Sequence, residues 1–390
     1  MTDQNPALPP TNRLLQLAGI FFKIGSISFG GPMALIAIME EEFVQKRKWL
    51  SQEHFLDLVA ATNMVPGPNA CEMAAHIGFV RAGYPGLVVA ELSFFLPAVV
   101  LSSLLGVVYV RYGSLPQVDA LFYGINPVIL ALILMATYRL GKTTLTSRPQ
   151  FLVFGLALLA SFLDVNEVII IFGSGLLAML ISEWPRIKNK GAPLLLFFPL
   201  FYNSGAPLKF ISAAADNVLL KLFLFFLKTG SLIFGSGMVL FTFIHEDIVE
   251  RLGWLTEQQL IDAIAVGQMT PGPVTSTSAF IGYLIAGWPG AAVSALGNFL
   301  PSFIIVAAIG PLIPKMRQSR PLQALLRGIN AAVIALMISI CLTIAKNAVV
   351  DMWTLLVVLA SVAILFFYKV DSIWLVLGGA LIGLLRYFVG

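Results

Sequence analysis

Long apolar runs, separated by short polar stretches, dominate the pattern of residues along this chain. A helix that spans a bilayer needs about 20 consecutive apolar residues. The runs predict helical membrane elements at Leu14–Met39, Phe55–Val80, Leu87–Val110, Ala120–Arg139, Phe151–Leu163, Val168–Glu183, Val218–His245, Leu260–Ile285, Ala291–Ile313, Ala324–Ala345, Trp353–Tyr368 and Ile373–Phe388. Of these, Phe151–Leu163 is short for a span, and the separate run Leu194–Tyr202 is too short to cross and stays unassigned.

The same pattern occurs twice. The segment Phe22–Pro68 matches Leu227–Pro273 at a constant offset of 205 residues, so that Lys23 pairs with Lys228. After a deletion of one residue the offset becomes 204. Because the repeat covers most of both halves, it predicts two homologous units. The predicted divisions are an N-terminal tail (1–13), a first transporter repeat (14–183), a linker (184–217) and a second transporter repeat (218–390).

Basic residues favour opposite loops in the two halves. The loop with Lys46–Lys48 has a second-half counterpart that holds only Arg251 among several acidic residues. Conversely, Tyr109–Asp119 has one basic residue, whereas its counterpart Pro314–Arg327 has four. Cytoplasmic loops are enriched in Lys and Arg, so this reversal predicts repeats of inverted topology, an arrangement that many secondary transporters use.

Composition agrees with an all-α polytopic membrane protein. The chain is 58% hydrophobic and 11% charged, with a mean hydropathy of +0.90, whereas soluble domains are about 25% charged. Without a basic patch, the net charge of +4 gives no reason to expect a nucleic-acid partner. The cysteines and histidines form no disulfide framework or metal motif. No nucleophile motif or phosphate-binding Gly-Lys-Ser/Thr loop is found, so we expect neither an enzyme nor a cofactor.

Backbone breaks recur at matching positions in the two halves. They are Gly30-Gly31-Pro32 with Gly235-Ser236-Gly237, and Pro66-Gly67-Pro68 with Pro271-Gly272-Pro273. Proline disrupts a helix interior and glycine permits unusual backbone angles. Non-helical backbone at membrane depth is tolerated only where protein or a water-filled cavity surrounds it.

These breaks predict broken or re-entrant helices, with simple kinks as the alternative. A helix that restarts after a break points free N–H groups and the positive end of its dipole at an anion. Hydroxyl and amide side chains beside the breaks can donate to the same anion. The predicted substrate-binding residues are Lys23, Lys228, Gly30, Gly31, Gly235, Gly237, Pro66, Gly67, Pro68, Asn69, Pro271, Gly272, Pro273 and Thr275.

Charged residues within the apolar runs form a further group of candidates. Lys23 and Lys228 suit a dianion, because a charge inside the bilayer is costly and usually functional. The alternative for each is a lysine that extends its amine to the membrane interface. The predicted proton-coupling or gating residues are Glu72, Glu41, Glu246 and His76. Glu91 is a further candidate for proton coupling, and the matched Asp57 and Asp262 are interpreted as helix-start residues.

The order Lys-x-Gly-x-x-x-Phe-Gly-Gly-Pro, then Trp-Leu, then Pro-Gly-Pro, present in both halves, resembles the chromate ion transporter (CHR) family. The length and the two repeats are similar to its long-chain, two-domain branch, and the resemblance extends from Leu14 to Phe388. The second glycine-rich break departs from the motif, reading Gly235-Ser236-Gly237.

The resemblance implies a multi-pass protein of the bacterial inner membrane that expels chromate, confers chromate resistance and is driven by the proton-motive force. Chromate and sulfate are nearly isosteric dianions, so a carrier of sulfate or of another anion is the first alternative. A passive anion channel is the second. The expected partners are a small inorganic oxyanion and the lipid bilayer, and a homodimer is left open.

Overall fold

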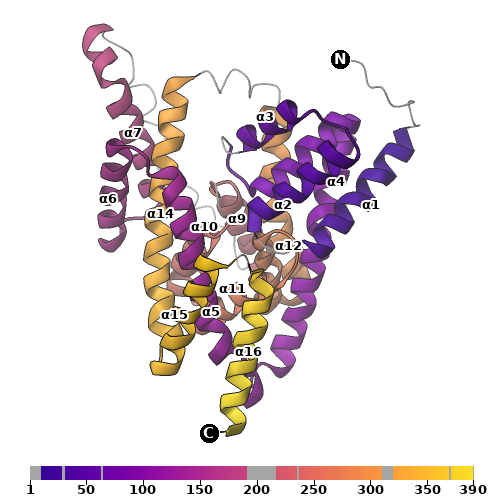
Figure 1. The fold of residues 1–390 in the computed structure, drawn as a ribbon, viewed down its shortest axis with the longest axis vertical. Coiled ribbons are helices and arrows are strands. Elements are labelled where there is room, and N and C mark those ends of the chain that lie inside the picture. Colours follow the sequence, from indigo (N-terminus) through magenta and orange to yellow (C-terminus); the bar gives the residue numbers. More distant parts are fainter. Residues whose placement is uncertain are drawn as a thin grey trace.

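The computed structural model describes residues 10–28, 31–62, 65–190, 217–234, 237–309, 319–368 and 370–389, and every regular element within them is helical. The first half contains α1 (Pro10–Ile27), α2 (Gly31–Glu40), α3 (Gln52–Thr62), α4 (Asn69–Tyr112), α5 (Pro116–Thr144), α6 (Arg148–Phe162) and α7 (Glu167–Lys190). The second half contains α9 (Val218–Gly230), α10 (Val239–Phe243), α11 (Glu257–Met269), α12 (Thr277–Ile309), α14 (Arg320–Ala348), α15 (Met352–Phe367) and α16 (Ser372–Val389). Figure 1 shows these helices as one bundle.

Among the described residues, five helices are long and apolar enough to cross a membrane. They are α4, α5, α12 together with the turn before it, α14 and α16, and α6 and α15 are apolar but shorter. The predicted all-α polytopic fold is therefore confirmed.

Several predicted elements are divided in the structure, which corrects their boundaries. The predicted span Leu14–Met39 is two helices, α1 and α2, and Phe55–Val80 is divided between α3 and the start of α4. At the second break Gly67 has a φ of 154°, which a helix cannot contain. With 10 and 11 residues, α2 and α3 are about half as long as a span requires. The second half divides in the same way, so the predicted broken helices are confirmed.

α4 and α12 are tight helical hairpins rather than straight helices. Gly83 in α4 (φ 62°, ψ −151°) and its counterpart Gly287 in α12 (φ 63°, ψ −152°) reverse the chain. At the crossing of the two arms of α4, Gly78 packs on the Gly86 carbonyl so closely that a side chain would not fit. Each hairpin has a short first arm (69–81 and 277–285) and a long second arm (84–112 and 288–309).

Counterpart residues of the two halves touch each other. Phe95 of α4 stacks on Phe299 of α12, with ring centroids 4.1 Å apart and planes 4° apart, and 95 + 204 = 299. The side chains of Thr137 and Cys341 also interact, and 137 + 204 = 341. A residue can meet its own counterpart only on a two-fold axis, so an approximate two-fold axis relates the halves.

The long arms of α4 and α12 run antiparallel across this axis. Near one end Leu87 clusters with Val306, and further along the same arms Phe95 stacks on Phe299. As the residue number rises along one arm, it falls along the other. The axis is therefore perpendicular to both arms.

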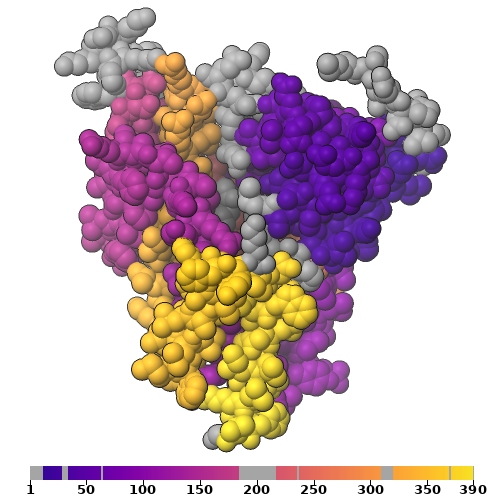
Figure 2. Space-filling model, viewed as in Figure 1, coloured from indigo at the N-terminus to yellow at the C-terminus, as the bar shows by residue number. Residues whose placement is uncertain are grey.

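The halves are also intertwined through their last helices. α5 packs against α15 and α16 of the other half, and α14 packs against α6 and α7. Glycines permit these close crossings, because Gly124 lies against the Gly379 carbonyl and its counterpart Gly328 lies against the Ser174 carbonyl. In Figure 2 the surface of the yellow C-terminal helices borders purple and magenta segments of the first half. We infer that neither half forms its core alone.

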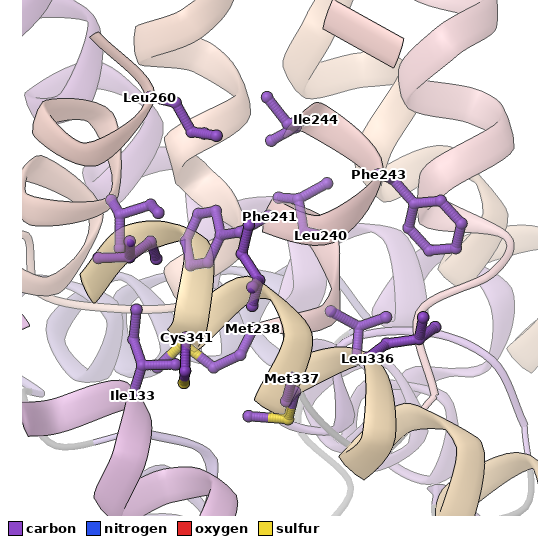
Figure 3. Close-up of a cluster of buried hydrophobic side chains, with 14 of the residues drawn as sticks. Ile133, Met238, Leu240, Phe241, Phe243, Ile244, Leu260, Leu336, Met337 and Cys341 are labelled. Atoms are coloured by element: carbon purple, nitrogen blue, oxygen red, sulfur yellow. The ribbon is translucent and has the colours of Figure 1, made fainter. Parts of the chain in front are cut away.

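The main apolar core surrounds α10. Leu240, Phe241 and Phe243 are completely buried. Figure 3 shows them among residues of the neighbouring helices, including Leu260 of α11 and Leu336 of α14. The short helices of the second half are therefore enclosed by long ones.

Candidate functional site

The backbone breaks of the two halves meet at the centre of the molecule. The Gly67 N–H donates to the Ile233 carbonyl (2.6 Å), and the Gly272 N–H donates to the Ser28 carbonyl (2.8 Å). Because 28 + 205 = 233 and 67 + 205 = 272, these are the same hydrogen bond formed twice. Each Pro-Gly-Pro turn is thus bound to the end of the lysine-bearing helix of the other half.

A small cavity of about 30 Å³ lies at this junction. A single ordered water needs about 10–15 Å³ on this measure, so the cavity has room for two or three waters. A tetrahedral oxyanion is larger than a water molecule, and the junction must widen to admit one. The lining residues are Leu35, Pro68, Asn69, Ala70, Gly237, Met238, Gly272, Pro273, Val274 and Thr275.

Two helix starts contribute to the cavity wall. α4 begins at Asn69 directly after Pro68, and the 3₁₀ turn Val274–Ser276 follows Pro273 and leads into α12. Neither start has a side-chain cap, and the Pro68 and Pro273 carbonyls accept from Cys71 and Ser276 in these first turns. Aligned peptide dipoles make such starts positive, and both favour an anion between them.

Thr275 adds a hydroxyl to these backbone donors. Its side chain is 1% exposed and, among the described residues, its Oγ1 has no hydrogen-bond partner. The Asn298 amide donates to the Thr275 carbonyl (3.2 Å) and fixes this turn. A buried polar atom is normally paired, so the unpaired hydroxyl suits a ligand or water in the cavity.

The structure brings together most of the backbone positions that the sequence predicted. Pro68, Asn69, Gly237, Gly272, Pro273 and Thr275 line the cavity. Gly67 makes the hydrogen bond described above, Pro66 and Pro271 lie beside these turns, and Gly31 starts α2. The predicted Gly30 and Gly235 lie outside the described residues. The lining residues that were not predicted are Leu35, Ala70, Met238 and Val274, because an apolar wall residue has no distinctive sequence signal.

Neither predicted lysine lies in the cavity wall. The Lys23 side chain is exposed on α1. Lys228 forms an ion pair with Asp247 (2.7 Å), with the two side chains 11% and 8% exposed, and Arg251 binds the same carboxylate (3.0 Å). The two lysines are equivalent in sequence but differ in environment.

The predicted acidic residues separate into two groups. Glu41 is exposed beside Lys46 (2.8 Å), whose ammonium lowers the pKa of that carboxyl, and Glu246 is paired with Arg251. Both lie on π-helical turns, Glu41–Lys46 and Ile244–Arg251, outside the cavity wall. In contrast, Glu72 and His76 are buried in the first arm of α4, at 0% and 4% exposure.

A second cavity of about 230 Å³ lies between α5, α11 and the end of α14, lined in part by Asp119 and Asp262. Asp262 is 3% exposed and accepts hydrogen bonds from Tyr109 (2.7 Å) and Gln258 (2.8 Å). The sequence placed Asp262 at the start of a helix, and only the tertiary packing reveals that it is buried.

Known proteins resemble each half of the chain separately as well as the whole chain. A family model described as "Chromate transporter" matches residues 15–179 and again 220–384. The "Chromate transport protein" of Cupriavidus metallidurans is 32% identical over 97% of this chain and 94% of that protein. The "Probable chromate transport protein" of Synechococcus elongatus is 30% identical over 89% and 88%, respectively. The "Uncharacterized transporter YwrA" of Bacillus subtilis matches only 31% of this chain, but 68% of its own length, at 31% identity. No solved structure matches the chain significantly.

Proposed function

Because the chain belongs to the chromate transporter family, we propose that it binds chromate in the central cavity and expels it from the cell. The protein is a multi-pass membrane transporter rather than an enzyme, and this much follows from the family and the apolar helices. The substrate, the site and the direction are the proposal. Sulfate has the same charge and shape, so we propose it as a competitor for the site.

The observation that carries the proposal is the paired hydrogen bond between Gly67 and Ile233 and between Gly272 and Ser28. It holds two uncapped helix starts on the wall of one cavity, where their N–H groups and dipoles favour an anion. Thr275 supplies a hydroxyl donor. The site therefore binds a dianion through oriented dipoles, and the lysines act from outside the cavity wall.

Access to the site changes from one side to the other in this proposal. Antiparallel packing of the counterpart arms of α4 and α12 supports an inverted arrangement, with the two-fold axis in the membrane plane. Rearrangement about this axis would open the junction first to one side and then to the other. We propose that the proton-motive force drives this cycle in the bacterial inner membrane. A homodimer is compatible with the cycle, which needs only one chain.

Lys228 has a positioning role in this account. Its ion pair with Asp247 ties α9 to the π-helical turn Ile244–Arg251, and α9 leads directly to the Ile233 carbonyl at the junction. Lys23 lies on the exposed face of α1, where its amine can reach the membrane interface.

The test is exchange of labelled chromate by purified protein in liposomes loaded with unlabelled chromate, with Gly272→Ala as the main variant. Gly272 has a φ of 94°, and an added Cβ would lie 3.0 Å from the Ala98 side chain. Backbone strain of this kind costs about 1–3 kcal/mol, so we expect exchange to fall about tenfold or more.

The matched control is Gly155→Ala on α6, where a Cβ meets nothing within 4 Å. We expect wild-type exchange in the control and inhibition of the wild type by excess sulfate. An exchange rate in Gly272→Ala equal to that of the control would remove this turn from the transport path. Chromate currents across a planar bilayer that need no exchange partner would instead favour a passive channel.

A further inference from the structure

Two buried carboxyl groups lie together in the first half. Glu72 is on the first arm of the α4 hairpin and Glu91 on the second, and both are 0% exposed. They are close enough to interact electrostatically. Among the described residues, none of their four carboxyl oxygens has a hydrogen-bond partner.

The groups around the pair supply no compensating charge in the described structure. On α4 itself, Cys71 and His76 are buried with the pair, and the Arg81 guanidinium lies over the Trp49 ring at 4.5 Å. The adjoining α12 contains no charged residue and contributes hydroxyls, of which that of Ser302 lies beside Glu91. The remaining titratable side chains on the described parts of the helices that pack on α4 are Arg13, Lys23, Glu40, Glu53, His54, Asp57, Glu257, Asp262 and Tyr283.

Burial makes two negative charges at this position very costly. An ionised carboxylate without a partner in a low-dielectric interior loses several kcal/mol of solvation, and a second charge beside it adds repulsion. Within the described part of the chain neither group has a cation to offset this cost, and the Ser302 hydroxyl lies beside Glu91 alone. The neutral form is therefore favoured, which means that the pair holds protons.

We propose that Glu72 and Glu91 together form the proton-binding site of the transporter. They take up protons when water reaches α4 and keep them while the pair is buried. The role of the pair in coupling depends on the proposed function. That the pair holds a proton does not depend on it. Glu41 is solvated beside Lys46 and Glu246 is paired with Arg251, so neither carries a buried charge without a cation.

The pair lies next to the proposed anion site. The Glu72 carboxyl packs directly on Gly67, which is bound to Ile233, and Pro68, Asn69 and Ala70 line the cavity one helical turn away. Movement of the Pro-Gly-Pro turn during transport must therefore move Glu72. Because the same turn contacts Glu72 and the cavity, proton binding at Glu72 and anion binding in the cavity are thermodynamically linked.

The pair belongs to one half only. The positions equivalent to Glu72 and Glu91 are Thr277 and Ala295, since 72 + 205 = 277 and 91 + 204 = 295. Thr277 donates its hydroxyl to the Val274 carbonyl (2.7 Å) and is satisfied there. The two-fold related position in α12 therefore has no carboxyl group.

The first experiment detects the proton directly, by infrared spectroscopy of the purified protein at neutral pH. We expect the C=O band of a protonated carboxylic acid in the wild type, and its reduction in Glu91→Gln and Glu72→Gln. Glu53→Gln on the exposed side of α3 is the matched control and should leave the band unchanged. A band that neither buried substitution alters would overturn the proposal.

The second experiment tests the coupling in liposomes. We expect Glu91→Gln to retain chromate exchange, which needs no net proton movement, and to lose chromate accumulation driven by a pH gradient. Gradient-driven accumulation at the wild-type rate in both glutamine variants would refute the coupling role. If the wild type exchanges no chromate, the proposed substrate fails, and the infrared band still decides whether the pair holds a proton.

Discussion

The half-length helices α3 and α11 occupy equivalent positions in the two repeats but differ in burial. Ile261 of α11 is 2% exposed and its counterpart Leu56 of α3 is 53% exposed. Asp262 is likewise buried, whereas Asp57 is exposed. Related sequences in two environments are expected of a transporter with one side closed and the other open. The repeated sequence therefore specifies where each half-length helix forms, but it does not specify how deeply that helix is buried.

The hydrogen bonds of α11 explain part of this difference. Tyr109 and Gln258 both donate to the Asp262 carboxylate, which joins α11 to the long arm of α4. The residue equivalent to Tyr109 is Ile313, because 109 + 204 = 313, and isoleucine has no hydroxyl group. The second half therefore has a polar contact at α11 that the first half cannot form in the same way at α3.

The largest effect is expected when the two lysines are compared. Lys228→Met leaves the buried Asp247 paired with Arg251 alone, and the loss is at most the roughly 3–5 kcal/mol that breaking a buried pair costs. Lys23→Met, at an exposed position, should have little effect on stability. Thermal unfolding followed by size-exclusion chromatography measures both. Equal destabilisation would contradict the unequal environments, and partial recovery in Lys228→Met with Asp247→Leu would support the ion pair.

A smaller effect is expected for Tyr109→Phe. Loss of a hydrogen bond to a charged group costs about 1.5–3 kcal/mol, and here the loss weakens the contact that closes α11. We expect a cysteine placed at Ile261 to react faster with a thiol reagent in the Tyr109→Phe background. Tyr138→Phe, at an exposed tyrosine on α5, is the control. Unchanged reactivity would show that this hydrogen bond does not keep α11 closed.

Much of the fold could be predicted from the sequence, because it depends on local pattern. Apolar runs located the helices, and the offset of 205 residues identified the halves. Pro66-Gly67-Pro68 located a break, since proline and glycine disrupt helices wherever they occur. The same reasoning placed the wall of the central cavity at these turns.

The remainder could not be predicted because it depends on contacts between distant segments. Lys23 and Lys228 have the same local sequence, and only tertiary packing pairs one of them with Asp247. The stacking of Phe95 on Phe299 likewise depends on the crossing of α4 and α12. Each glutamate of the buried pair was visible as a charge in an apolar run, but their proximity requires the reversal of the chain at Gly83.

The most direct test of the account is the reactivity of single cysteines at Leu56 and Ile261, measured with and without saturating chromate or sulfate. The native Cys71 and Cys341 are both buried and give a low background. Without an anion, we expect the cysteine at 56 to react quickly and the cysteine at 261 slowly. An oxyanion should change the two rates in opposite directions, because in the proposed cycle one side opens as the other closes. Rates that do not respond to either anion, or that change together, would contradict the account.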